Sequence, residues 1–536
     1  MNDLERRVGE RRTFAIISHP DAGKTTLTEK LLLYGGAIHV AGQVAARRAR
    51  RSATSDWMEL ERERGISITS TVLQFPYRGH TINLLDTPGH QDFGEDTYRT
   101  LMAADSAVML IDAARGVEPQ TKKLFAICRE RGIPLFTFIN KMDRPSRDPL
   151  ELLDELESVL GIAAFPMNWP LGNGERFRGV YDRATHEVHV FERTAHGAKR
   201  AAVQLAGIGD PSLRDLVDEE SYREFIDGVE LLEGAGARFD RDAFARGAAT
   251  PVFFGSAATN FGVQLFLDRF LELAPPPGPR AFADGTEVPP ETPRFSGFVF
   301  KIQANMDPRH RDRIAFLRVC SGEFARDMVV RNGRSGKEVR LARAMRLFAD
   351  ERESLETAYA GDVVGLANPG VFAIGDPIYV GNEVTFAPIP AFAPEHFASV
   401  RSIDSAGYKS FAKGIAQLRE EGAVQVFYPY GSMRSEPILG AVGELQFEVA
   451  KYRLEAEYNV RTHFSRLPHD TIRRVEGELV GATPLQLGSG SMLLEDWEGR
   501  PVLLAEREWG LRLIEEWNPK HRLLPFTTRL HQEATA

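Results

Sequence analysis

The sequence predicts an α/β domain with a doubly wound, mostly parallel sheet, followed by an antiparallel β-barrel domain and a C-terminal α+β domain. Three observations predict this arrangement. Short apolar strands alternate with helical patterns in the first half of the chain, glycine-punctuated strands follow, and two proline-rich segments separate the parts. A length of 536 residues fits several domains, since one domain takes roughly 150 residues.

The first domain is predicted from strands that are apolar throughout. They cover residues 13–17, 82–85, 108–111, 135–139 and 252–254. Strands without polar alternation are typical of a parallel sheet that helices cover on both faces. A hairpin-like stretch and an acidic helical stretch interrupt this rhythm at about 169–246, and we interpret them as an insertion. We expect the whole domain to span 1–278.

The proline-rich segments 274–279 and 387–394 mark the domain boundaries, because proline neither continues a helix nor donates to a sheet. Short strands separated by glycines between them predict a small β-barrel, which we assign to 279–390. Strand, helix and strand patterns then predict an α+β domain over 391–536.

Composition excludes several classes of protein. The 66 basic and 75 acidic residues give a net charge of −9, which argues against a polycation that binds DNA or RNA indiscriminately. No run of 18 apolar residues predicts a membrane span. Cys128 and Cys320 fit neither a disulfide framework nor zinc spacing. We expect a monomeric protein of the cytoplasm.

A phosphate-binding loop is predicted where the first strand runs into a helical pattern. Its residues are Ser18, His19, Pro20, Asp21, Ala22, Gly23, Lys24, Thr25 and Thr26. In such a loop, backbone N–H groups face the β-phosphate, Lys24 brings charge to the β- and γ-oxygens, and Thr25 offers a hydroxyl to Mg²⁺. Ser18 stands where a glycine is usual, so this motif alone does not separate the site from a surface loop.

A second motif follows the strand at 82–85. It consists of Asp86, Thr87, Pro88 and Gly89, with His90 next in the chain. Asp86 is suited to hold Mg²⁺ through water, and the Gly89 N–H is suited to bind a γ-phosphate and to turn once that phosphate leaves. His90 is either an ordinary loop histidine or the residue that places the attacking water, and we favour the second interpretation.

The purine is predicted to be guanine. Asp143 is able to accept both N1–H and N2–H₂ of guanine, whereas adenine leaves that carboxylate unpaired. Asn140 is predicted to join this loop to the phosphate loop, and the stem of Lys141 to cover the base. Ser256 and Ala257 follow another strand, and we expect the Ala257 N–H to face guanine O6.

With these motifs in order, the chain resembles the translational GTPase family. The sequences of segments 18–26, 64–70, 86–90 and 438–447 are similar to those of the release factor branch of this family, and the resemblance extends over about 10–530. It implies GTP, GDP and Mg²⁺ as ligands, with Thr25, Ser67 and Asp86 near the metal. Ser67 occupies the position where elongation factors carry a threonine.

The resemblance also implies a function. It is that of a ribosome-stimulated GTPase of translation termination, which promotes dissociation of class 1, codon-reading release factors after peptide release. Catalysis is expected from positioning and electrostatics, with Lys24 and His90 as catalytic residues. Alternatives are a translocase of the elongation factor G type, a tetracycline-protection factor and a non-hydrolysing GTP-binding scaffold. An ATP-driven enzyme conflicts with Asp143.

A cluster of arginines lies in the stretch at about 37–69 that corresponds to the first switch of the family. Its members are Arg47, Arg48, Arg50 and Arg51. They form either a solvated basic loop or a contact to RNA phosphates.

Overall fold

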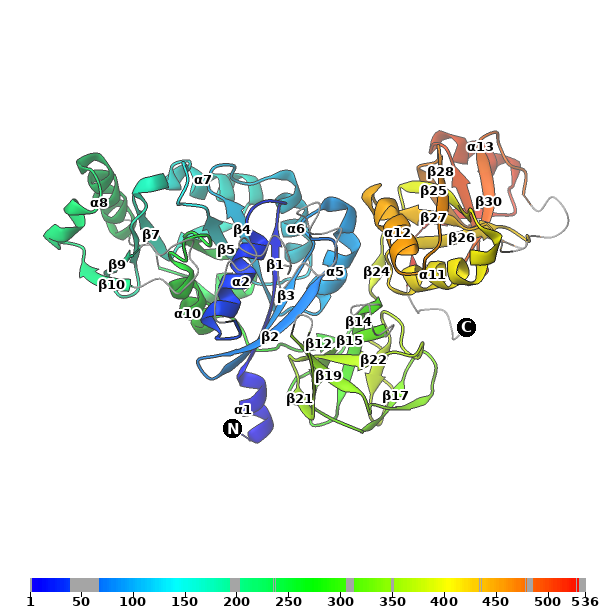
Figure 1. The fold of residues 1–536 in the computed structure, drawn as a ribbon, viewed down its shortest axis with the longest axis horizontal. Helices are drawn as coiled ribbons and strands as arrows, with labels where there is room; N and C mark the ends of the chain where they lie inside the picture. Colours follow the sequence, from blue (N-terminus) through cyan, green and yellow to red (C-terminus); the bar gives the residue numbers. More distant parts are fainter. Residues whose placement is uncertain are drawn as a thin grey trace.

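The computed structural model describes residues 2–38, 67–192, 203–304, 313–348, 351–477, 479, 485–526 and 528–529, except positions 235, 237, 433 and 435. Three parts follow one another along the chain (Figure 1). The blue to dark-green part contains the predicted parallel sheet, the light-green part lies beside it, and the yellow to red part lies at one end. Helix α1 (Asp3–Gly9) precedes the first sheet.

The central sheet of the first part has the strand order β2-β3-β1-β4-β5-β11-β6. All neighbouring pairs are parallel except β2 with β3. The strands are β1 (Arg11–Ser18), β2 (Thr71–Tyr77), β3 (His80–Asp86), β4 (Ser106–Asp112), β5 (Leu135–Asn140), β6 (Ala163–Pro166) and β11 (Ala249–Phe254). The predicted doubly wound sheet is confirmed.

Helices cover both faces of this sheet, which explains why its strands are apolar throughout. On β1, Phe14 and Ile16 enter one core while Ala15 and Ile17 enter the other. Alternate residues of a strand point to opposite faces, so a sheet covered twice needs apolar side chains at every position. One core includes α2 (Lys24–Tyr34) and α10 (Val263–Leu273), and the other includes α5 (Gly94–Met102), α6 (Pro119–Glu130) and α7 (Pro149–Leu160).

Between β6 and β11, the residues that the structure describes form an antiparallel sheet with two α-helices. The sheet has the order β10-β9-β8-β7. Its elements are β7 (Asn168–Leu171), β8 (Gly179–Asp182), β9 (Glu187–Phe191), β10 (Val203–Gly207), α8 (Glu219–Gly234) and α9 (Arg241–Ala245), with short 3₁₀ turns η2 (Gly174–Arg176) and η4 (Pro211–Asp215). Helix α8 includes much of the acidic stretch noted in the sequence, and it packs against β7 at the end of the molecule farthest from the red strands (Figure 1).

The second part is the predicted antiparallel β domain, a curled sheet of order β18-β17-β23-β14-β15-β22-β19. Its strands are β14 (Ser296–Ala304), β15 (Arg313–Ser321), β17 (Val329–Asn332), β18 (Glu338–Arg340), β19 (Ala344–Phe348), β22 (Val363–Ala367) and β23 (Pro377–Tyr379), with β20 (Glu351–Ser354) paired to β19. Short pairs flank it: β12 (Arg280–Ala281) with β13 (Glu287–Val288), and β16 (Glu323–Ala325) with β21 (Thr357–Tyr359). Phe348 of β19 also pairs with Leu73 of β2, which joins this sheet to the first.

Within its described residues, the third part has an eight-stranded antiparallel sheet and three α-helices, confirming the predicted α+β class. The sheet order is β28-β25-β27-β26-β30-β31-β29-β32. Its elements are β25 (His396–Ser402), η5 (Ser405–Gly407), α11 (Tyr408–Glu420), β26 (Gln425–Pro429), β27 (Ile438–Ala441), α12 (Leu445–Ala456), β28 (Thr462–Leu467), β29 (Thr471–Glu476), β30 (Ser491–Asp496), β31 (Pro501–Ala505), α13 (Trp509–Trp517) and β32 (Arg522–Pro525). Strand β24 (Pro390–Ala391) pairs with β33 (Thr528–Arg529).

Both cysteines are free and buried. Burial raises the pKa of Cys128 to about 12 and that of Cys320 to about 11, so both thiols stay protonated near neutral pH. No helix among the described residues has the length and apolar character that crossing a bilayer requires.

Candidate functional site

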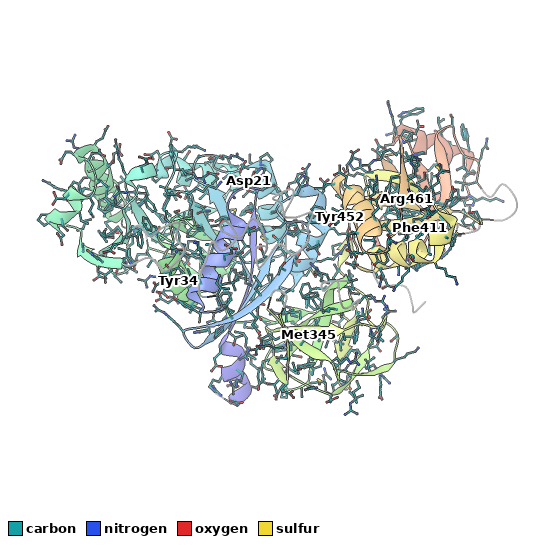
Figure 2. All side chains as sticks on the ribbon, viewed as in Figure 1. Asp21, Tyr34, Met345, Phe411, Tyr452 and Arg461 are labelled. Atoms are coloured by element: carbon teal, nitrogen blue, oxygen red, sulfur yellow. The ribbon has the colours of Figure 1, made fainter. Side chains whose placement is uncertain are left out.

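A cavity of about 490 Å³ opens at the carboxyl ends of the parallel strands. Its wall contains the predicted residues Ser18, His19, Pro20, Asp21, Gly23, Lys24, Thr25, Thr26, Ser67, Gly89, His90 and Lys141, together with Arg115 and Arg144. The predicted residues Ala22, Asp86, Thr87, Pro88, Asn140, Asp143, Ser256 and Ala257 are not part of this wall. Figure 2 labels Asp21 at this end of the sheet, while Tyr34 lies toward the opposite end of α2.

The phosphate loop connects β1 to α2, which begins at Lys24 without a side-chain cap. Uncapped N–H groups at a helix start favour an anion. Gly23 precedes this helix with a φ of 98°, and a Cβ there would lie 2.4 Å from Asn140 Nδ2. Glycine is therefore needed both for the left-handed backbone and for the close approach of the two loops.

Two polar atoms of this loop lie buried without a hydrogen-bond partner among the described residues. They are the Ser18 hydroxyl and His19 Nδ1. Buried polar atoms are normally paired, because leaving one unpaired costs about 1–3 kcal/mol. Both residues line the cavity, so the unpaired atoms fit a site that takes a polar ligand.

Lys24 is the central charge of the cavity. Its ammonium donates to Asp86 Oδ1 at 2.7 Å and to the Ser67 hydroxyl at 3.2 Å, and both Lys24 and Asp86 are buried. Lys24 thus contacts both Asp86 and Ser67, two residues from distant motifs that were predicted to lie near a metal. Thr25, the third predicted metal residue, lies on the cavity wall.

The chemistry of these three side chains suits Mg²⁺, which prefers oxygen and is commonly held by one or two carboxylates together with substrate phosphates. Within the described ranges, no group of three or more His, Cys, Asp or Glu side chains is arranged to hold a metal ion by itself. Asp86 with two hydroxyls therefore fits a magnesium ion that also binds phosphate oxygens.

The base-side loops meet through Asn140. Its Nδ2 donates to the Ala22 carbonyl at 2.8 Å, and its Oδ1 accepts from the Ala257 N–H at 2.9 Å. The Ala257 N–H, which we expected to face guanine O6, donates to Asn140 Oδ1 in this structure, and its contact with guanine stays a prediction. Nearby, the Ser256 hydroxyl donates to Asp143 Oδ1 at 2.6 Å, which fixes one oxygen of the carboxylate.

Asp112, at the end of β4, is a site residue that the sequence reasoning missed. Its Oδ2 accepts from the Lys141 ammonium at 2.8 Å. Burial raises the pKa of Asp112, but hydrogen bonds from Lys141 and from the Ala114 N–H outweigh it and lower that pKa below its ordinary value. The sequence did carry a signal for Asp112, because this carboxylate stands at the end of an apolar strand. The same signal was used for Asp86.

The sequence reasoning also missed Arg115 and Arg144 of the cavity wall and Glu118, which lies beside the predicted residue His19. His19 Nε2 is 3.3 Å from the carboxylate of Glu118, and Arg115 is 3.5 Å from the same carboxylate. Arg144 directly follows Asp143 and also lines the cavity. Their charge alone did not separate these arginines from surface residues.

The segment after residue 66 is held by groups from two other elements. The Ser70 N–H and hydroxyl both donate to Asp96 Oδ2 on α5, and the Lys301 ammonium on β14 donates to the Ser70 carbonyl. Burial raises the pKa of Asp96, yet the Lys301 charge and the Ser70 hydrogen bonds outweigh it and lower that pKa. Arg47, Arg48, Arg50, Arg51, Arg64, Gly65 and Ile66 lie outside the described residues.

Comparison with known proteins identifies the family. Residues 9–276 match the elongation factor Tu GTP binding domain, 294–381 match elongation factor G domain 2, and 386–515 match the C-terminal domain of class II release factor RF3. Peptide chain release factor 3 of Gloeobacter violaceus is 59% identical over 527 residues, covering 98% of this chain and 99% of that protein. The chain belongs to the peptide chain release factor 3 family.

Other matches agree with this assignment. Peptide chain release factor 3 of a Cyanothece species is 57% identical, covering 97% of this chain and 96% of its own length. A crystal structure from Thermus thermophilus has a TM-score of 0.68 at 24% identity, covering 91% of this chain and 72% of that one, and it supports the fold. As a release factor 3 family member, the chain has the guanine nucleotide-binding domain of translational GTPases.

Proposed function

We propose that this protein is a ribosome-stimulated GTPase of translation termination that promotes dissociation of class 1 release factors after peptide release. Membership of the release factor 3 family is the observation that carries the proposal. The match of 386–515 to the RF3 C-terminal domain favours termination over translocation of the elongation factor G type. We further propose that it acts as a monomer on the ribosome, with domains at 1–278, 279–390 and 391–536.

The cavity supports binding of a nucleoside triphosphate. The uncapped start of α2 and the side chain of Lys24 lie at one hollow, whose wall also includes Ser18, and they suit phosphate oxygens. Asp86, Thr25 and Ser67 would hold Mg²⁺, which supplies positive charge against the β- and γ-phosphates. In that state Lys24 exchanges its present partner Asp86 for phosphate oxygens.

Guanine selection is assigned to Asp143. Its Oδ1 already accepts from Ser256, and the carboxylate retains lone pairs for the paired donors of guanine. Asn140 holds the phosphate and base loops at a fixed spacing, so that one nucleotide spans both.

His90 is assigned to hydrolysis. It lines the cavity beside Gly89 and Ser67, where its imidazole is able to orient a water toward the γ-phosphate. No covalent intermediate is needed, because charge neutralisation and orientation together lower the barrier.

The test is GTP hydrolysis with and without purified ribosomes, together with the dissociation rate of a labelled class 1 release factor from those ribosomes. We expect ribosomes to stimulate the wild-type protein strongly. His90→Ala should bind GTP normally and lose about a hundredfold or more of the stimulated rate. His80→Ala, at the opposite end of β3, is the matched control.

Two results would contradict the proposal. Absence of ribosome stimulation would favour a GTP-binding scaffold over a GTPase. Stimulated hydrolysis without faster factor dissociation would favour another translational step. Full activity of His90→Ala would remove His90 from the mechanism while leaving the family assignment intact.

A further inference from the structure

The start of helix α12 in the C-terminal part lies against the loop that carries His90. The contact is made by Asp92, in the 3₁₀ turn η1 (Gln91–Phe93). The Leu445 N–H donates to Asp92 Oδ2 at 2.8 Å, and this hydrogen bond is buried. Helix α12 has no side-chain cap from its own N-cap residue, Glu444. Asp92 therefore caps a helix that begins 353 residues later in the chain.

Asp92 also contacts the imidazole of His90. The Asp92 N–H donates to His90 Nδ1 at 3.3 Å, and Oδ1 of the Asp92 carboxylate lies 3.3 Å from the same nitrogen. His90 Nδ1 is thus fixed by one residue, whose side chain is in turn fixed by α12. His90 itself lines the cavity.

Gly443 makes this approach possible. A Cβ at Gly443 would lie 2.0 Å from Asp92 Cγ, so only glycine fits against the carboxylate. Gln446 holds the backbone there, since its Oε1 accepts from the N–H groups of Val442 and Gly443 at 2.8 and 3.1 Å. Gly443, Leu445 and Gln446 of the motif at 438–447, which the nucleotide site does not otherwise explain, therefore take part in the Asp92 contact.

An apolar cluster surrounds the hydrogen bond. It contains Ile68 and Phe93 from the first part of the chain and Leu445 and Val449 from α12, with Tyr452 packed against them. Ile68 directly follows Ser67 of the cavity wall. Helix α12 faces α5 in Figure 1, and Tyr452 lies on that side of the C-terminal part in Figure 2.

We propose that Asp92 is a positioning residue for GTP hydrolysis, held by the docked start of α12 so that His90 stays oriented toward the cavity. Hydrolysis then depends on docking of the C-terminal part, because an undocked α12 leaves the carboxylate without its Leu445 partner and free to rotate. The inference rests on the role proposed for His90. A small misplacement of an orienting group costs about a hundredfold in rate.

Two variants on opposite sides of the contact test this inference. Asp92→Asn keeps an oxygen for the Leu445 N–H but removes the anionic partner of the imidazole. Gly443→Ala forces the carboxylate away from α12. We expect both to lower kcat of ribosome-stimulated hydrolysis by about a hundredfold with KM and GTP affinity unchanged. The double variant should be no slower than the slower single variant, since both act through one group.

Gly510→Ala, where a Cβ meets no atom within 4 Å, is the matched glycine control. Hydrogen exchange at the amides of α12 gives a second readout: Gly443→Ala should accelerate it, and Asp92→Asn should not. The inference is overturned if both single variants keep wild-type kcat while His90→Ala is inactive. It is also overturned if GTP affinity falls as much as kcat, because Asp92 would then support only structure. If His90→Ala is fully active, the role proposed for His90 fails first.

Discussion

At the scale of single residues, the side chain of Asn140 holds the base loop and the phosphate loop together. Its motif predicts a link between base and phosphate loops, and the Ala22 carbonyl is indeed its partner. The same side chain also takes the Ala257 N–H, which the sequence reasoning assigned to guanine. A sequence motif indicates which loops meet. Which N–H group the Asn140 oxygen accepts from depends on distances in the folded chain, and those distances are not visible in the sequence.

Asp143→Asn should weaken GTP binding and shift preference toward xanthosine triphosphate. Asparagine presents a donor where guanine also presents one, whereas the oxygen at C2 of xanthine accepts from that amide. A competition assay with the two nucleotides measures the shift, which we expect to be about tenfold to a hundredfold. Asp154→Asn, on the exposed surface of α7, is the control. Unchanged preference would contradict the base assignment.

At the scale of elements, the strands were predictable because local patterns determine them. Every residue of β1 from Thr13 to Ser18 is buried, and that pattern is visible without coordinates. The hydrogen bonds that join Ser70 to α5 and β14 were not predictable. Lys301 lies 231 residues from Ser70 in the chain, and it belongs to no recognisable sequence motif. Long-range polar pairs depend on how the domains dock.

The Asp96 carboxylate makes the stability that these Ser70 contacts contribute depend on pH. Its pKa is lowered from 3.8, so the folded state binds that proton less readily than the unfolded state. Its contribution to stability is therefore fully present above about pH 4 and is lost as pH falls through the lower folded pKa. Asp96→Asn should lower the thermal midpoint at pH 7 and lessen its fall in acid, as measured by calorimetry from pH 7 to pH 3.

Asp227→Asn, on the exposed face of α8, provides the comparison for that series. Its thermal midpoints should follow those of the wild type at every pH. An Asp96→Asn protein with an unchanged acid profile would show that the carboxylate contributes nothing across this interface.

At the scale of the whole molecule, a buried polar joint connects the first and second parts. Arg318 on β15 donates to Asp105 Oδ2 and to the Gly361 carbonyl, each at 2.6 Å, and Arg280 donates to Asp105 Oδ1 at 2.7 Å. The Thr13 hydroxyl reaches the same Gly361 carbonyl at 2.7 Å. The sequence analysis predicted these two parts as separate domains but not which of their faces meet, because nothing in the sequence distinguishes Arg318 from other arginines on strands.

Arg318→Met should destabilise this joint by about 3 kcal/mol. That value is at the low end for breaking a buried ion pair, since Arg280 still neutralises Asp105. The urea midpoint of the full chain measures the change. Arg461→Ala removes an ion pair to Asp404 that is largely solvent-exposed, and it should move the midpoint little. Equal effects of the two substitutions would contradict the importance of burial.

The pairing of Phe348 with Leu73 has one more consequence. Strand β2 begins just after the Ser67 segment and turns directly into β3, which ends at Asp86. Because β2 pairs with β3 along its length and with β19 at Phe348, the cavity end of β3 is connected to the second part through paired strands. We expect a displacement of the β2–β3 hairpin to move the neighbouring strand β19 with it.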